Sequence, residues 1–176
     1  MSKSILSACA LFLASTGLAQ AHATLEQAEA PVGASYKAVF RVPHGCDGKP
    51  TNTVRVQIPE GVITAKPMPK AGWTLEKVTG AYAQSYEYHG RTLSEGVKEV
   101  VWSGGNLGDD EYDEFALRLY LTADLPVGEI LHFPVVQKCP DGLAERWIEV
   151  PAMGQSEDDL ELPAPGVTLL QKAGGR

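Results

Sequence analysis

The sequence predicts an all-β protein, a sandwich of about seven or more mostly antiparallel strands. Seven short runs rich in β-branched and aromatic residues are separated by Gly and Pro at short intervals, as in sandwich folds. The 176 residues include 18 Gly and 12 Pro, and no window sustains the periodicity of an amphipathic helix. Strands and turns, rather than helices, are therefore expected to form the core.

The predicted strands follow one another along the whole middle of the chain. They cover residues 35–42, 53–58, 73–78, 99–102, 114–121, 130–137 and 146–150. The fifth run alternates most clearly, placing Phe115, Leu117, Leu119 and Leu121 on one face, as expected for a half-buried strand. Prolines end or interrupt several runs: Pro43, Pro59, Pro126, Pro134 and Pro151. Proline at these places suits edge strands and turns and argues against a buried parallel sheet.

The first 21 residues have the features of a secretory signal peptide. Lys3 precedes an apolar run from Ile5 to Ala14, and Ala19-Gln20-Ala21 is a small-x-small cleavage signal. Cys9 superficially suggests a lipoprotein signal, but the apolar stretch before it is too short for export. We therefore predict cleavage between Ala21 and His22 and a periplasmic or extracellular product.

The mature chain is expected to form one domain, residues 22–152, followed by an extended tail, residues 153–176. The tail is predicted from an acidic stretch and closely spaced prolines, although Leu169 and Leu170 could dock on the domain. No second apolar stretch approaches the roughly 20 residues needed to span a membrane. The formal net charge of −7 also removes the electrostatic attraction on which nucleic-acid binding depends.

Two cysteines, Cys46 and Cys139, remain after removal of the predicted signal peptide. In an oxidising, exported setting an even pair favours a disulfide. The alternative is a two-thiolate copper or zinc site, which would need further ligands; His44 is the one imidazole close to either cysteine in sequence.

Cleavage before His22 would give this residue an unusual capacity for binding metal. Its α-amine and its ring Nδ1 can chelate one ion together, and two cis nitrogens suit the tetragonal geometry of Cu(II). Before cleavage the same backbone nitrogen is an amide and offers no free lone pair. The alternative is that His22 merely follows the signal peptide and has no metal-binding role.

Several motifs are spread over the predicted domain. They are the start His22–Tyr36, Phe40–Cys46, Val54–Gly61, Gly72-Trp73, Val101-Trp102, Tyr112–Phe115, and Phe133–Cys139 continuing to Trp147. Together, over about residues 22–152, they resemble the YcnI-like family of exported bacterial copper-binding proteins. The resemblance implies an immunoglobulin-like β-sandwich that binds one Cu(II) through the processed N-terminal histidine. It also implies an acidic side chain and a tryptophan at the site, and other copper-handling envelope proteins as partners.

By position, the resemblance assigns the acidic ligand to Glu29 and the tryptophan to Trp147, with Glu26 as the rival carboxylate. A carboxylate would neutralise part of the charge of the ion, whereas an indole, which carries only an N–H donor, would shield the site from water. The alternatives are that Glu29 is a surface acid near a turn and that Trp147 is a core aromatic.

The other candidate groups are expected to be structural. His132 lies in an apolar run and His89 beside a turn glycine, whereas His44 could join the site if a Cys46–Cys139 disulfide brings its loop toward the N-terminus. The acidic run 109–114 lacks the spacing of a calcium loop and is expected to be a solvated entry to a strand. Catalytic triads, phosphate-binding loops and zinc-finger spacings are absent from the sequence.

These observations predict a copper chaperone or buffer that holds one Cu(II) per chain and is not an enzyme. One alternative is a metal-free envelope module that binds a partner protein. Another is an oxidative copper enzyme using an N-terminal histidine, which would need a second imidazole and a flat, open face for a polymer.

Overall fold

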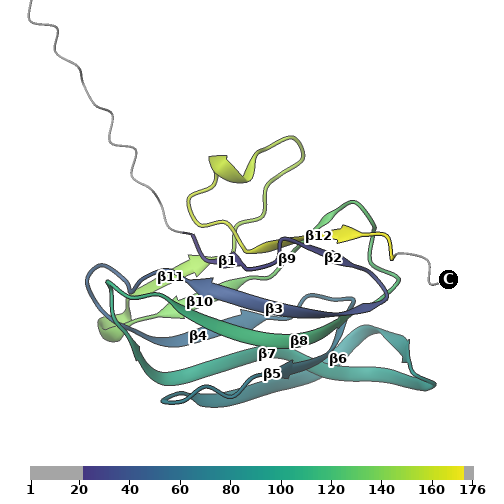
Figure 1. Ribbon diagram of the computed structural model, residues 1–176, viewed down its shortest axis with the longest axis horizontal. Coiled ribbons are helices and arrows are strands. Elements are labelled where there is room, and N and C mark those ends of the chain that lie inside the picture. Colours follow the sequence, from purple (N-terminus) through teal and green to yellow (C-terminus); the bar gives the residue numbers. More distant parts are fainter. Residues whose placement is uncertain (1–21, 173–176) are drawn as a thin grey trace, which may run out of the picture.

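The structure is a computed structural model that describes residues 22–172. Its strands form three sheets, shown in Figure 1. The first sheet has the order β1 (Thr24–Leu25), β3 (Ala34–Val42), β8 (Asp113–Leu121), β5 (Val62–Pro67). The second has the order β11 (Ala144–Trp147), β10 (Val135–Lys138), β4 (Thr51–Gln57), β7 (Arg91–Leu107), β6 (Thr74–Tyr88). The third has the order β2 (Glu29–Pro31), β12 (Gly166–Leu170), β9 (Ile130–His132). Two short 3₁₀ turns, η1 (Pro140–Gly142) and η2 (Glu157–Asp159), complete the described elements.

Alternation along β8 builds one wall of the core. Phe115, Leu117, Leu119 and Leu121 are all buried, as the sequence predicts, while Arg118 points to solvent. The core side chains of both large sheets interlock through aromatic contacts. Phe115 meets the Trp102 ring from β7 at 5.3 Å between centroids. Burial of a side chain such as Phe115 contributes about 1.5–3 kcal/mol, so the packing between these two sheets stabilises the fold.

Proline divides one predicted strand into two. The run 130–137 was expected to be continuous, but it separates at Pro134 into β9 and β10. Proline has no N–H with which to continue a ladder. The two halves pair with different partners, β9 with β12 and β10 with β4. The last predicted strand, 146–150, is also displaced, since β11 ends at Trp147.

The region expected to be a tail contains a strand of the fold. β12 runs parallel to β2 and antiparallel to β9, and its Val167 and Leu169 are buried. The domain therefore extends well beyond residue 152. Leu169 packs into the core, a possibility that the sequence left open, while the neighbouring Leu170 is 38% exposed. Figure 1 shows the segment with η2 projecting from the side of the molecule that carries β12.

A disulfide joins Cys46 to Cys139 across 93 residues, as predicted. It connects the loop between β3 and β4 to the end of β10. A disulfide of this kind indicates an oxidising, extracytoplasmic compartment. Within residues 22–172, no helix is long and apolar enough to cross a membrane. The predicted signal peptide, residues 1–21, and its cleavage site lie outside the described residues.

Candidate metal centre

Trp147 ends β11 at the edge of the second sheet and points inward. Its side chain is 3% exposed, and its backbone pairs with Val135 of β10. The indole Nε1 donates a hydrogen bond to Oε1 of Gln137, 3.2 Å away. The ring is therefore fixed both by packing and by a buried hydrogen bond.

His22 lies against this indole. The two ring centroids are 5.9 Å apart and the planes are inclined by 59°. The position of His22 is set by the residues that follow it, because Ala23 and Leu25 are buried and Leu25 pairs with Phe40 of β3. The start of the described chain is thus held to the sandwich, and two of the predicted site residues, His22 and Trp147, lie together.

His44 approaches the same indole from the loop between β3 and β4. Its ring centroid is 6.4 Å from that of Trp147, with the planes inclined by 69°. The His44 Nδ1 lies 2.6 Å from the carbonyl oxygen of Gly45. Because a carbonyl oxygen can only accept, this hydrogen bond places the ring proton on Nδ1.

A buried glutamine ties the His44 loop to Trp147. Gln137, which is fully buried, donates through Nε2 to the carbonyl oxygens of His44 and Gly45 and to Oγ1 of Thr51. Its Oε1 accepts the indole N–H. One side chain therefore positions both the loop that carries His44 and the ring that His22 and His44 approach.

The carboxylates near the N-terminus occupy different settings. Glu29 is exposed on β2, opposite Thr168 of β12. Glu26 forms an ion pair with Arg41 at 3.6 Å. Glu157 lines a pocket of about 260 Å³ together with His22, a placement that the sequence analysis missed. No local signal pointed to it, since Glu157 lies in the acidic stretch that was assigned to the tail.

The remaining histidines have structural surroundings. His132, on β9, has its Nδ1 3.2 Å from the carbonyl oxygen of Ala164 and 4.0 Å from a Glu157 oxygen. His89 is exposed in the turn between β6 and β7, where its ring packs on Tyr88 at 4.4 Å.

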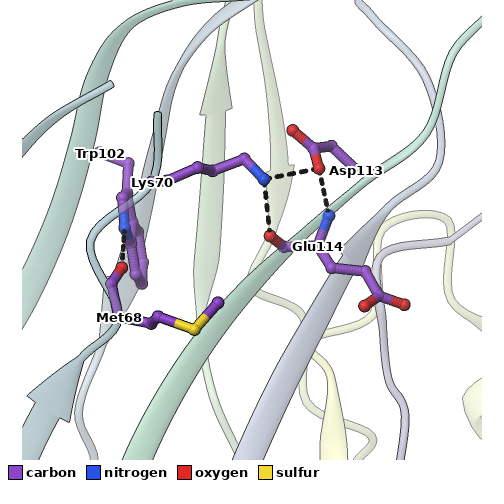
Figure 2. Close-up of polar contacts among 5 residues, drawn as sticks. All are labelled: Met68, Lys70, Trp102, Asp113 and Glu114. Atoms are coloured by element: carbon purple, nitrogen blue, oxygen red, sulfur yellow. Dashed lines mark hydrogen bonds and ion pairs between the residues drawn. The ribbon is translucent and has the colours of Figure 1, made fainter. Parts of the chain in front are cut away.

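The acidic run leads into β8. The Lys70 ammonium donates to Asp113 Oδ1 at 2.6 Å and to the Glu114 carbonyl oxygen at 3.1 Å (Figure 2). Nearby, the Trp102 indole donates to the Met68 carbonyl oxygen at 3.2 Å. The contacts of Lys70 attach the start of β8, and that of Trp102 attaches β7, to the chain that leaves β5.

The donors beside Trp147 fit a copper ion only if the terminal amine takes part. Among residues 22–172, no three His, Cys, Asp or Glu side chains gather closely enough to hold a metal by themselves. The imidazoles of His22 and His44 are borderline nitrogen donors of the type that Cu(II) favours, and cleavage before His22 would add a third nitrogen. The donor chemistry is therefore compatible with Cu(II), with the free N-terminus as a requirement.

Comparison with known proteins gives the family. The model of a family described as a domain of unknown function, DUF1775, matches residues 22–169. The chain belongs to this family. DUF1775 is the domain of the YcnI-like proteins, so the resemblance seen in the sequence is confirmed. The match also includes β12, in agreement with a domain that continues past residue 152.

The fold has a counterpart of known structure. The crystal structure of a protein from Nocardia farcinica, reported to have an immunoglobulin-like fold, superposes with a TM-score of 0.63 at 25% identity. The alignment covers 85% of this chain and 99% of that one. This DUF1775 chain is thus an immunoglobulin-like β-sandwich, as predicted. No curated protein matches the sequence.

Proposed function

We propose that the mature DUF1775 protein binds one Cu(II) through His22 and serves as an exported copper chaperone or buffer. The observation that carries the proposal is the contact between the His22 ring and the buried Trp147 indole, 5.9 Å between centroids. A terminal residue usually moves freely, and a chelate made from it would lose entropy on binding. Here β1 holds the residue in place before any metal arrives.

The amine and imidazole of His22 would supply two nitrogens, and the wall formed by Trp147 would shield one side of the ion. The indole nitrogen carries a proton and already donates to Gln137, so it is unsuited to ligation. Trp147→Phe should therefore weaken copper binding while leaving the number of nitrogen ligands unchanged.

An acidic group is proposed to complete the site. Glu29 remains the proposed carboxylate, since Glu26 already pairs with Arg41. The structure adds Glu157 as a second candidate, because it lines the same pocket as His22. A carboxylate would offset part of the charge of the ion. It would therefore bind Cu(II) more strongly than a neutral group at the same position.

Equilibrium dialysis of the correctly processed protein tests the proposal. It should retain one Cu(II), His22→Ala should not, and the control His89→Ala should behave as wild type because His89 lies in an exposed turn. Affinity should also fall as the pH is lowered, since copper competes with protons for the amine and imidazole nitrogens. Equal binding by wild type and His22→Ala would contradict the proposal.

Oxygen uptake separates a carrier from an oxidative enzyme. The copper-loaded protein, given excess ascorbate, is expected to consume no more oxygen than the same concentration of a small copper chelate. Sustained turnover that disappears in His22→Ala would instead support an enzyme.

A further inference from the structure

We propose that His44 is a second imidazole ligand of the copper, binding through Nε2, and that Gln137 and the Cys46–Cys139 disulfide hold it in position. The inference rests on the Cu(II) site proposed at His22 and extends it to a site with three nitrogens. Four features of the loop between β3 and β4 support it.

The first feature is proximity to one shared neighbour. His22 and His44 come from different parts of the chain, yet their rings lie 5.9 and 6.4 Å from the same indole. Trp147 is buried and fixed, so the two imidazoles, which come from different parts of the chain, share one rigid neighbour. A tetragonal Cu(II) ion that holds the amine and ring of His22 still has an equatorial position for another nitrogen.

The second feature is the tautomer of His44. Its Nδ1 donates to the carbonyl oxygen of Gly45 at 2.6 Å, so the lone pair is left on Nε2. Histidines that bind metals commonly donate their other ring N–H to a backbone carbonyl, which orients the ring and raises its basicity. His44 thus has the hydrogen bond of a ligand before the metal binds.

The third feature is the support beneath the loop. Gln137 donates to the carbonyl oxygens of both His44 and Gly45, and Thr51 Oγ1 donates to the His44 carbonyl oxygen at 3.3 Å. The same glutamine accepts the Trp147 N–H. Since Gln137, Thr51 and Trp147 are buried, hydrogen bonds lost by these side chains are costly, and the loop keeps its place relative to the indole.

The fourth feature is the disulfide. Cys46 lies two residues after His44, and Cys139 lies two residues after Gln137. The bridge therefore fastens the His44 loop to the strand that carries the glutamine. An imidazole held in this way loses little freedom when it binds, which favours its use as a ligand.

Pulsed electron paramagnetic resonance on the mature wild-type protein with one Cu(II) is the test, with affinity measured by chelator competition. We expect modulation from two imidazoles in wild type and from one in His44→Ala, with a loss of affinity of about tenfold or more, as for removal of groups that tune a metal site. His89→Ala, the matched control, should keep both imidazoles and the wild-type affinity. Near-ultraviolet circular dichroism checks that His44→Ala is folded.

The outcomes separate this inference from the function on which it rests. A wild-type signal from a single imidazole, or a His44→Ala protein with wild-type signal and affinity, overturns the role of His44 and leaves the His22 site intact. A wild-type protein that binds no Cu(II) overturns both. Because the imidazole count is read from wild type, the result does not depend on the folding of any variant.

Discussion

The indole nitrogen of Trp147 donates to the side-chain oxygen of Gln137 at 3.2 Å, where both side chains are almost completely buried. This hydrogen bond fixes the plane of the ring that His22 and His44 approach. It also joins the end of β11 to the loop between β3 and β4, because Gln137 donates to the His44 carbonyl oxygen. One neutral side chain, Gln137, thus contacts both the ring and the loop of the proposed site.

Replacement of that residue should weaken both stability and copper binding. Gln137→Leu keeps the approximate volume but leaves the Trp147 N–H without its acceptor and removes one of the two donors to each of the His44 and Gly45 carbonyl oxygens. Each buried polar group left unpaired costs about 1–3 kcal/mol, so we expect a loss of roughly 2–4 kcal/mol in urea unfolding. An unchanged midpoint and an unchanged copper affinity would show that the glutamine does not organise the site.

The carboxylates can be ranked by single substitutions. Glu29→Gln should lower copper affinity and alter the electron paramagnetic resonance spectrum, because it removes the proposed anionic ligand. Glu26→Gln should change little, since it breaks only an exposed ion pair with Arg41, worth about 0–1 kcal/mol. If Glu157→Gln produces the effect expected of Glu29→Gln, the acidic ligand is the one from the η2 segment.

The disulfide should contribute directly to stability. Thiol titration of denatured, unreduced mature protein should detect no free thiol. A Cys46→Ala, Cys139→Ala double variant should lose about 2–5 kcal/mol of unfolding free energy, because the bridge closes a long loop in the unfolded chain. Two titratable thiols in the untreated protein would contradict the bridge.

Glu60 should make the protein less stable in acid. Burial of this carboxylate raises its pKa, but hydrogen bonds from Lys98, Tyr86 and the Ala83 N–H outweigh that effect and leave the pKa below its usual value. The contribution of the Glu60 carboxylate to folding stability is therefore present above its unfolded-state pKa. It is lost as the pH falls through the folded-state pKa. Since the side chain is 37% exposed, Glu60→Gln should cost only about 1 kcal/mol at pH 7.

The pH dependence supplies the check. Urea unfolding of wild type and Glu60→Gln should differ at pH 7, and the difference should shrink as the pH falls through the folded-state pKa of Glu60, because the carboxylate then becomes protonated in both states. A difference that persists undiminished down to the most acidic pH at which the protein folds would show that the charge of Glu60 does not contribute.

Local patterns predicted the parts of the fold that depend on neighbouring residues. Alternation in residues 115–121 identified β8 and its buried face, because a half-buried strand must alternate. By contrast, β1 has two residues and β2 three, too few for any periodicity to show. Their existence depends on long-range pairing, and β12 was missed for the same reason.

The residues of the candidate site also divide into those that the local sequence predicted and those whose position depends on long-range contacts. A small-x-small signal pointed to His22, and family resemblance pointed to Trp147, but no spacing could show that His44 lies beside the same ring. That proximity follows from the disulfide and from Gln137, which act between residues about 90 positions apart. Glu157 reaches the pocket only because β12 returns to the sandwich beside β2.

Copper is proposed to be held by the free N-terminus beside Trp147. Chelator competition should therefore compare the Cu(II) affinity of protein that begins at His22 with that of protein carrying one extra residue before it. We expect tight binding of one ion by the first protein and a loss of at least tenfold in the second, where the amine has become an amide. Equal affinities would contradict the proposal.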